Sequence, residues 1–182
     1  TWLLHISPSP YPFIIKHDKI SVMAHNPEDA AQTERNPDFE FQILTDKAGQ
    51  PYLAILKALN PSSLTVVPAQ INNLPVREIA ERAFADNRRL AEVILPEGLQ
   101  IIRAEAFYNC RNLQKINFPA TLLEIGTQRS LRAGRKLSGA FENCVNLSAV
   151  DIPHSVVIMA KNTFRGCVNL RSFQFPRHII GI

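Results

Sequence analysis

The hydrophobic positions of the chain follow their clearest pattern between Leu90 and Leu113, in the stretch LAEVILPEGLQIIRAEAFYNCRNL. Much of the later sequence repeats this stretch. Three residue types keep one register, at intervals of 23, 34 and 23 residues: Phe84, Phe107, Phe141 and Phe164; Pro96, Pro119, Pro153 and Pro176; Leu90, Leu113, Leu147 and Leu170. A fixed period of roughly 20–29 residues indicates a solenoid of stacked coils, and the interval of 34 is one period of 23 with an 11-residue insertion.

Each copy predicts a short strand before its proline, because apolar and polar residues alternate there. Stacked coils would pair these strands in parallel, about 4.7–4.9 Å apart. A second apolar segment in each copy predicts the opposite wall, and the four phenylalanines predict an internal stack. The residues expected to point inward are Leu90, Val93, Leu95, Leu99 and Ile102, then Leu113, Ile116, Phe118, Leu122 and Ile125, then Leu147, Val150, Ile152, Val156 and Met159, then Leu170, Phe173 and Phe175.

The remaining sequence predicts how the solenoid begins and where it is interrupted. Residues 38–60 contain two strand-like runs around Gly49, which favours a hairpin cap over the first coil. Residues 61–182 form the coils, with five extra residues between Pro68 and Ile79 and an insertion at about 128–138. Residues 1–37 do not fit the repeat and are an extension or cap of uncertain structure. We therefore expect a right-handed α/β-type repeat solenoid of about five coils, made mostly of short β-strands and turns.

Composition and charge add little about the fold but suggest a kind of partner. No apolar run reaches the roughly 18 residues of a membrane helix, and the opening residues lack the basic region of a signal peptide. The net charge is +4, but residues 1–99 carry nine Lys/Arg against twelve Asp/Glu, and residues 100–182 carry eleven against four. A basic half favours acidic partners, although the same residues can simply keep the outer face of the coils soluble.

The three cysteines occupy one repeat position, three residues before the leucine that opens a coil: Cys110, Cys144 and Cys167. Asn87 takes this position in the first coil. An odd number of cysteines in equivalent positions does not describe a disulfide framework, and no C-x-x-C motif supports a zinc site. We therefore expect buried, structural thiols.

The repeated units L-x-x-V-x-L-P, L-x-x-I and A-F-x-N-C-x-N-L resemble the BspA-like leucine-rich repeat family, most specifically at residues 109–113, 143–147 and 166–170. The resemblance covers about residues 38–182. It implies a curved solenoid that binds proteins, commonly on bacterial surfaces or in secreted proteins, so a secreted or cell-surface location is expected and the compartment stays open. Two features depart from the family pattern, namely the insertion and the ending at Ile182 inside a coil.

No sequence motif for catalysis is present. Phosphate loops, G-x-S-x-G and H-E-x-x-H are all absent from the sequence, so we expect neither an enzyme nor a cofactor. The function favoured is a protein-interaction module that binds a host or bacterial protein. One alternative is the substrate-recognition domain of a larger effector or enzyme. Another is the binding of an acidic ligand or nucleic acid by the basic half, although the scarcity of aromatic residues on the expected binding face argues against nucleic acid.

Two surfaces are candidates for the binding site. The insertion must project from the coils, and its arginines suit carboxylates and phosphates, although a decoration without a partner fits equally well. The outward positions of the strands form the second candidate. The last coil also predicts pairing with a cap or with a second copy of the chain. The candidate residues are Arg129, Arg132, Arg135 and Lys136 in the insertion, and Glu92, Ile94, Lys115, Asn117, Asp151 and Gln174 on the strands.

Overall fold

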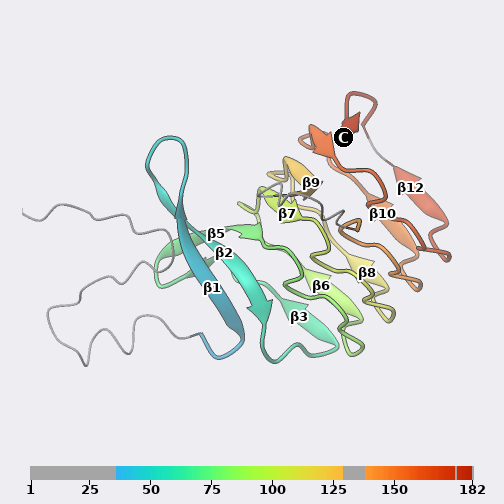
Figure 1. The fold of residues 1–182 in the computed structure, drawn as a ribbon, viewed down its shortest axis with the longest axis horizontal. Coiled ribbons are helices and arrows are strands. Elements are labelled where there is room, and N and C mark those ends of the chain that lie inside the picture. Colours follow the sequence, from blue (N-terminus) through green and yellow to red (C-terminus); the bar gives the residue numbers. More distant parts are fainter. Residues whose placement is uncertain (1–35, 129–137, 175, 182) are drawn as a thin grey trace, which may run out of the picture.

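The computed structural model describes residues 36–128, 138–174 and 176–181. In these residues the chain winds as a solenoid of about five coils, and short strands stack from coil to coil along two walls (Figure 1). The described residues contain strands and turns but no helix, so the α/β label expected from the sequence is wrong in that respect. Stacked strands on both walls satisfy the backbone without helices, because each coil bonds to the coils before and after it.

One wall is a sheet that runs along the whole described solenoid, and we call it the long wall. Its strands follow the order β1, β2, β5, β7, β9, β11 and β13, and β4 pairs with β5. Neighbouring strands in this sheet run parallel to each other, except for the antiparallel pairs β1–β2 and β4–β5. The bounds are Phe39–Thr45 (β1), Pro51–Ala58 (β2), Gln70–Ile71 (β4), Leu74–Ile79 (β5), Ile101–Arg103 (β7), Glu124–Thr127 (β9), Ile158–Met159 (β11) and Ile180–Gly181 (β13).

The other wall, which we call the strand face, is divided into two sheets. The strands β3, β6 and β8 form the first sheet, and β10 and β12 form the second. All these pairs are parallel, as the repeat predicts. The bounds are Leu64–Val66 (β3), Glu92–Ile94 (β6), Lys115–Ile116 (β8), Ala149–Asp151 (β10) and Ser172–Gln174 (β12).

The expected hairpin is present, and a second one accounts for the longer first coil. Strands β1 and β2 pair antiparallel ahead of the first coil, and Arg77 of β5 holds their loop through an ion pair of 2.8 Å with Asp46. The extra residues of the first coil form the small hairpin of β4 and β5. Its turn residues Asn72 and Asn73 have φ values of 51° and 62°, which suit a two-residue hairpin turn.

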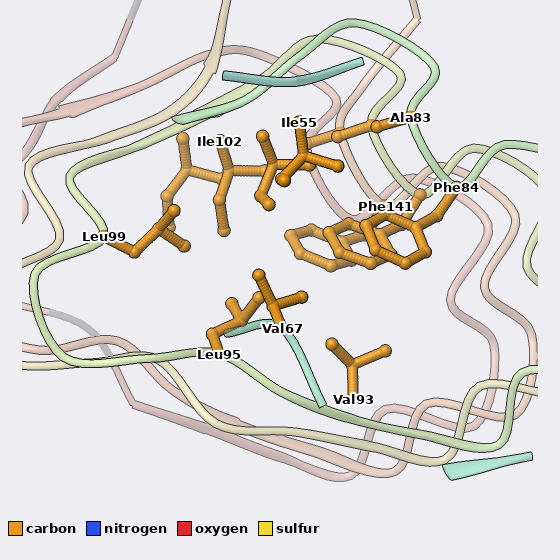
Figure 2. Packing of buried hydrophobic residues seen from close by; sticks show 14 of the residues in the cluster. Ile55, Val67, Ala83, Phe84, Val93, Leu95, Leu99, Ile102 and Phe141 are labelled. Atoms are coloured by element: carbon orange, nitrogen blue, oxygen red, sulfur yellow. The ribbon is translucent and has the colours of Figure 1, made fainter. Parts of the chain in front are cut away.

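The core lies between the two walls and has the phenyl stack as its centre (Figure 2). The rings of Phe84, Phe107, Phe141 and Phe164 follow one another at centroid distances of 4.8, 5.0 and 5.3 Å, within 11° of parallel. Each coil thus contributes one ring to a continuous column, as the sequence predicted. Offset aromatic pairs of this kind add to the free energy gained by burying their area.

Burial of the expected inward residues weakens toward the last coil. The inward residues of the second coil are buried, whereas Ile116, Phe118, Met159 and Leu170 are half-buried. Phe173 was expected inside but is 39% exposed, because β12 lies at the end of its sheet and Phe173 is covered on one side, where it meets Phe164 edge-on. Phe175 lies outside the described residues. No helix in the described ranges has the length and apolar character needed to cross a membrane.

Candidate functional site

The strand face presents two outward rows of side chains, and its first two strands, β3 and β6, make one end of it apolar. The register places Leu64 beside Glu92 and Val66 beside Ile94. Leu64, Val66 and Ile94 are 48%, 56% and 41% exposed, which leaves three large apolar side chains together in solvent. Glu92 is half-buried between them and the next coil. Exposed apolar groups that are contiguous are typical of a surface that binds a partner.

The opposite end of the strand face is polar. Lys115, Asp151 and Gln174 are exposed there, as expected for outward positions. Asn117 is also exposed, but its side chain bonds to the backbone of the preceding coil: Oδ1 accepts from Leu95 N at 2.7 Å, and Nδ2 donates to Leu95 O at 2.9 Å. Asn117 thus extends the ladder of the wall. A partner would have to compete with these two bonds to use its amide.

The strand face is interrupted between β8 and β10. At the preceding junction, the backbone N–H groups of Gln114 and Lys115 both donate to Ala91 O, and at the next junction Arg171 and Ser172 both donate to Ser148 O. Between β8 and β10 the sheet does not continue, and the hydrogen bond found there runs from Ser148 Oγ to Gln114 O at 3.5 Å. An open depression lies at this junction, lined by Gln114, Asn146, Ser148, Asn169 and Arg171.

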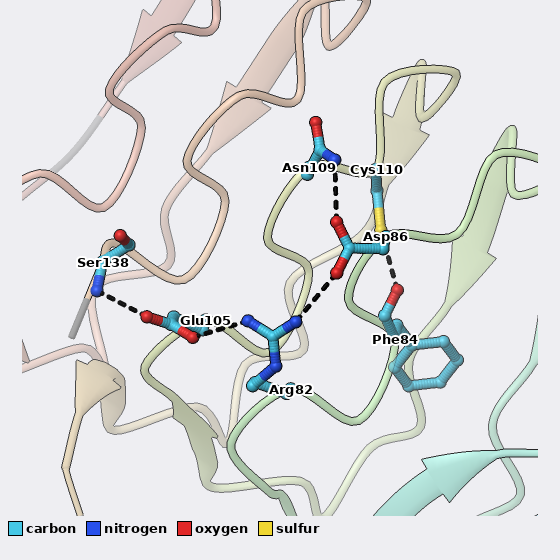
Figure 3. Close-up of polar contacts among 7 residues, drawn as sticks. All are labelled: Arg82, Phe84, Asp86, Glu105, Asn109, Cys110 and Ser138. Carbon is cyan, nitrogen blue, oxygen red and sulfur yellow. Dashed lines mark hydrogen bonds and ion pairs between the residues drawn. The ribbon is translucent and has the colours of Figure 1, made fainter.

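The insertion residues expected to bind a partner, Arg129, Arg132, Arg135 and Lys136, lie outside the described residues. The structure does describe how the chain leaves the insertion. Ser138 N donates to Glu105 Oε1 at 2.9 Å, and the other oxygen of this buried carboxylate pairs with Arg82 Nη1 at 2.8 Å (Figure 3). Arg82 also pairs with Asp86 at 2.8 Å. The hydrogen bond that Arg82 donates to Glu105 raises the pKa of Arg82, so this guanidinium stays charged.

Residues of this network have an unusual backbone conformation. Arg82 and Glu105 stand at equivalent repeat positions with φ values of 63° and 56°, in the left-handed region that long side chains seldom occupy. Asp86 and Asn109 are also left-handed and are joined by a hydrogen bond of 2.7 Å from Asn109 Nδ2 to Asp86 Oδ1. The interactions between coils compensate for the unfavourable conformations.

The cysteines form a second column, beside the phenyl stack. Each thiol donates to the carbonyl oxygen of a phenylalanine in the preceding coil: Cys110 to Phe84 at 3.0 Å, Cys144 to Phe107 at 3.1 Å, and Cys167 to Phe141 at 3.2 Å. All three are free thiols. Burial raises the pKa of Cys110 to about 12 and that of Cys167 to about 11, and it raises the pKa of Cys144 as well. Thiols that stay protonated are poor nucleophiles. What the column does provide is one hydrogen bond from each thiol to the preceding coil.

Two surface features were not found from the sequence. The apolar end was missed at Leu64 and Val66, although counting 28 residues back from the second coil would have placed both on the strand face. The break between β8 and β10 has no signal in the repeat register. Within the described ranges, no group of three or more His, Cys, Asp or Glu side chains is arranged to hold a metal ion.

The profile of the BspA type leucine rich repeat region matches residues 63–130 and 137–182, in six copies. No curated protein matches the chain. Several solved structures share the fold.

The similar structures are bacterial leucine-rich repeat proteins. The T. pallidum leucine rich repeat protein has 29% sequence identity and a TM-score of 0.67, and the match covers 82% of this chain and 64% of that one. A leucine rich cell surface protein of Faecalibacterium prausnitzii has 21% identity, a TM-score of 0.57 and coverages of 80% and 43%. One from Bacteroides capillosus has 22% identity, a TM-score of 0.52 and coverages of 69% and 86%.

The chain therefore spans 64% and 43% of the length of the first two of these proteins. Repeats of this type generally form protein-interaction modules, and the proteins that carry them are typically non-catalytic. The profile covers more than half of the chain, and the stacked coils agree with it. The chain belongs to the BspA-type leucine-rich repeat family.

Proposed function

We propose that this chain is a non-enzymatic protein-interaction module that binds a host or bacterial protein through its strand face and its basic inserted loop. The observation that carries the proposal is the apolar end of the strand face. Leu64, Val66 and Ile94 stand side by side on two paired strands, each at least 41% exposed. Burying such side chains at a partner's surface contributes roughly 25 cal/mol per Å² of apolar area.

The rigidity of the wall supports the same proposal. The side chains of β3 and β6 are fixed by a parallel ladder and by a core in which Val93 and Leu95 are buried. A surface that is already ordered loses little conformational entropy when it binds. The inserted loop, with Arg129, Arg132, Arg135 and Lys136, would extend this surface with charge, and its role stays a prediction. Self-association through the last coil also stays a prediction; Phe173 and Ile180 are exposed there.

The proposal is tested by binding measurements on purified proteins. The intact chain is compared by biolayer interferometry with the variant Val66→Ser/Ile94→Ser and with a deletion of residues 128–138, against a panel of host extracellular and bacterial surface proteins. Leu123→Ser is the matched control, because Leu123 is 40% exposed but precedes β9 on the long wall. Circular dichroism must show that all variants remain folded.

We expect the strand-face variant to weaken binding of a panel protein at least tenfold and the Leu123 control to change it less than about twofold. Unchanged affinity of the Val66/Ile94 variant would remove the strand face from the proposal. Unchanged affinity of the deletion would remove the inserted loop and leave the strand face as the site.

A further inference from the structure

The turns that lead into the strands of the strand face stack into a second surface, which we call the turn ridge. It consists of residues 87–91, 110–114, 144–148 and 167–171. Hydrogen bonds join neighbouring turns, including Asn112 Nδ2 to Arg88 O and Asn169 Nδ2 to Asn146 Oδ1. The ridge is therefore a continuous surface along one edge of the solenoid.

The turn ridge carries cations and no acidic residue. Arg88, Arg89, Arg111 and Arg171 lie on it, all four exposed, and none of its positions holds Asp or Glu. The nearby carboxylate of Asp86 is held by Arg82 and Asn109. The positive charge of the ridge thus faces solvent.

The arginines of the ridge differ from the arginines that form ion pairs in the described part of the chain. The ion pairs found there engage Arg77, Arg82 and Arg103, which join one coil or hairpin to another. None of these pairs includes an arginine of the ridge. Arg111 is positioned by a hydrogen bond of 2.8 Å from its Nε to Asn109 Oδ1, which leaves its charge without a carboxylate. Arg77, Arg82 and Arg103 therefore join parts of the solenoid, whereas the ridge arginines are exposed and take part in none of these ion pairs.

The depression at the interrupted wall gives the ridge a defined contact point. All five residues that line it belong to the ridge. Two acceptors on this lining are already used, since Asn146 Oδ1 accepts from Asn169 and Gln114 O accepts from Ser148. Arg171 and Asn146 also line the depression, and the guanidinium and the Nδ2 group of these side chains are hydrogen-bond donors. A lining with a cation and amide donors suits a carboxylate, which accepts hydrogen bonds and carries a negative charge.

We propose that the turn ridge binds an acidic segment of the partner protein, with one carboxylate in the depression at Arg171 and further acidic side chains along Arg111, Arg88 and Arg89. This inference rests on the proposed function and names the chemistry of the partner. The planar guanidinium forms two parallel hydrogen bonds with a carboxylate, which gives the contact direction as well as charge.

The composition of the ridge favours a polypeptide over a nucleic acid. None of its positions holds an aromatic residue, so unpaired bases have nothing to stack on. Phosphate contacts alone would give binding that falls steeply with salt and does not depend on the depression. The amide groups around Arg171 instead match a single carboxylate.

The test measures binding of labelled peptides by fluorescence anisotropy. The probes are a fluorescein-labelled octaglutamate peptide, an octaglutamine peptide with the same label, and a labelled 20-base-pair DNA duplex, each at 50 and 200 mM NaCl. The proteins are the full chain, the variant Arg111→Gln/Arg171→Gln, and the control Arg177→Gln. Arg177 is exposed and off the ridge, so its substitution removes a charge without changing the ridge.

We expect the full chain to bind octaglutamate at least tenfold more tightly than octaglutamine. The double variant should lose about tenfold or more in affinity for octaglutamate, because charged hydrogen bonds are removed, and Arg177→Gln should change it less than about twofold. The proposal is overturned if the full chain does not distinguish the two peptides, or if Arg177→Gln loses as much as the double variant. Tighter binding of the DNA duplex with a steep salt dependence would overturn it in favour of nucleic acid.

The same variants separate this inference from the proposed function. A panel protein that binds through Val66 and Ile94 but is unaffected by Arg111→Gln/Arg171→Gln would refute the ridge and leave the strand face standing. Octaglutamate binding that depends on Arg171, with no panel protein sensitive to Val66→Ser/Ile94→Ser, would refute the strand face and leave the ridge standing.

Discussion

Arg103 donates two hydrogen bonds to the carboxylate of Glu78 in the preceding coil, from Nε to Oε1 at 2.9 Å and from Nη2 to Oε2 at 3.1 Å. Glu78 is fully buried, and Arg103 is 13% exposed in its side chain. Arg103 also donates to Thr127 Oγ1 in the following coil at 2.9 Å. One guanidinium therefore joins three consecutive coils of the long wall. Burial lowers the pKa of Arg103, but the hydrogen bonds and charge of Glu78 more than offset this, so its pKa is raised.

Arg103→Leu should lower the free energy of unfolding by about 3 to 5 kcal/mol, because it leaves a buried carboxylate without its arginine. Urea unfolding followed by circular dichroism measures the loss. Arg77→Leu is the matched control: its pair with Asp46 is 28% and 29% exposed, so a loss below about 1 kcal/mol is expected. The double variant Glu78→Leu/Arg103→Leu should be more stable than Arg103→Leu alone. If the double variant is less stable than Arg103→Leu, the unpaired charge of Glu78 is not the cause of the loss in Arg103→Leu.

The phenyl stack should tolerate truncation worst at its centre. Phe107 is fully buried between Phe84 and Phe141, and Phe107→Ala should lower the free energy of unfolding by about 3 to 5 kcal/mol. Phe164 is half-buried toward the last coil, so Phe164→Ala should cost less. Chemical unfolding of the two variants measures these losses. If Phe107→Ala and Phe164→Ala lose the same free energy of unfolding, the column does not act as a buried core.

The thiols should react in the order of their burial. Cys167 is partly exposed, and its pKa of about 11 is lower than the pKa of Cys110, which is about 12. At pH 8, mass spectrometry after brief alkylation with iodoacetamide should find Cys167 modified first, and full modification of Cys110 and Cys144 should need denaturant. Rapid labelling of Cys110 in the folded chain would contradict the cysteine column.

The same pKa shifts predict how stability depends on pH. In the unfolded chain a thiol ionises near pH 9, but in the folded chain it stays protonated until about pH 11 to 12. The unfolded state therefore binds fewer protons above pH 9, and stability falls by up to about 1.4 kcal/mol per pH unit for each thiol between these values. The variant Cys110→Ala/Cys144→Ala/Cys167→Ala should show a shallower fall over pH 9 to 11. If the free energy of unfolding of this variant falls with pH as steeply as that of the original chain, the thiols are not the cause of the fall.

Gly139 is where two coils approach most closely after the insertion. A Cβ atom at this position would lie 1.8 Å from the carbonyl oxygen of Asn162, so the backbone would have to move. Gly139→Ala should lower the midpoint of thermal unfolding by several degrees, whereas Gly98→Ala, which meets nothing within 4 Å but has a φ of 96°, should cost only about 1 kcal/mol. A midpoint for Gly139→Ala no lower than that for Gly98→Ala would contradict this close approach.

The sequence was most informative about the interior of the coils. The register of leucine, proline and phenylalanine predicted which side chains stack, since one residue per coil at a fixed interval meets its equivalent in the next coil. It was less informative about pairs such as Glu78 and Arg103. Whether two polar side chains of neighbouring coils meet depends on the register between their strands. Here irregularities at Leu53/Ala54 and Ile102/Arg103 shift that register.

The candidate site could be predicted only in outline. The outward positions Ile94, Lys115, Asp151 and Gln174 are exposed as expected. The hydrogen bonds of Asn117 to Leu95 could not be foreseen, because alternation shows which way a side chain points and not what it bonds to. The turn ridge was hidden for a different reason: its arginines look scattered in sequence and come together only when the coils stack.

The interruption between β8 and β10 has a consequence for how the solenoid responds to force and heat. At every other junction between coils, strands pair along both walls, but at this one strand pairing is confined to the long wall, where β9 continues into β11. In a repeat array the coupling between neighbours sets the size of the cooperative unit. The junction between the third and fourth coils lacks one of the two strand ladders, so we expect the solenoid to bend and to begin local unfolding there more readily than at the other junctions.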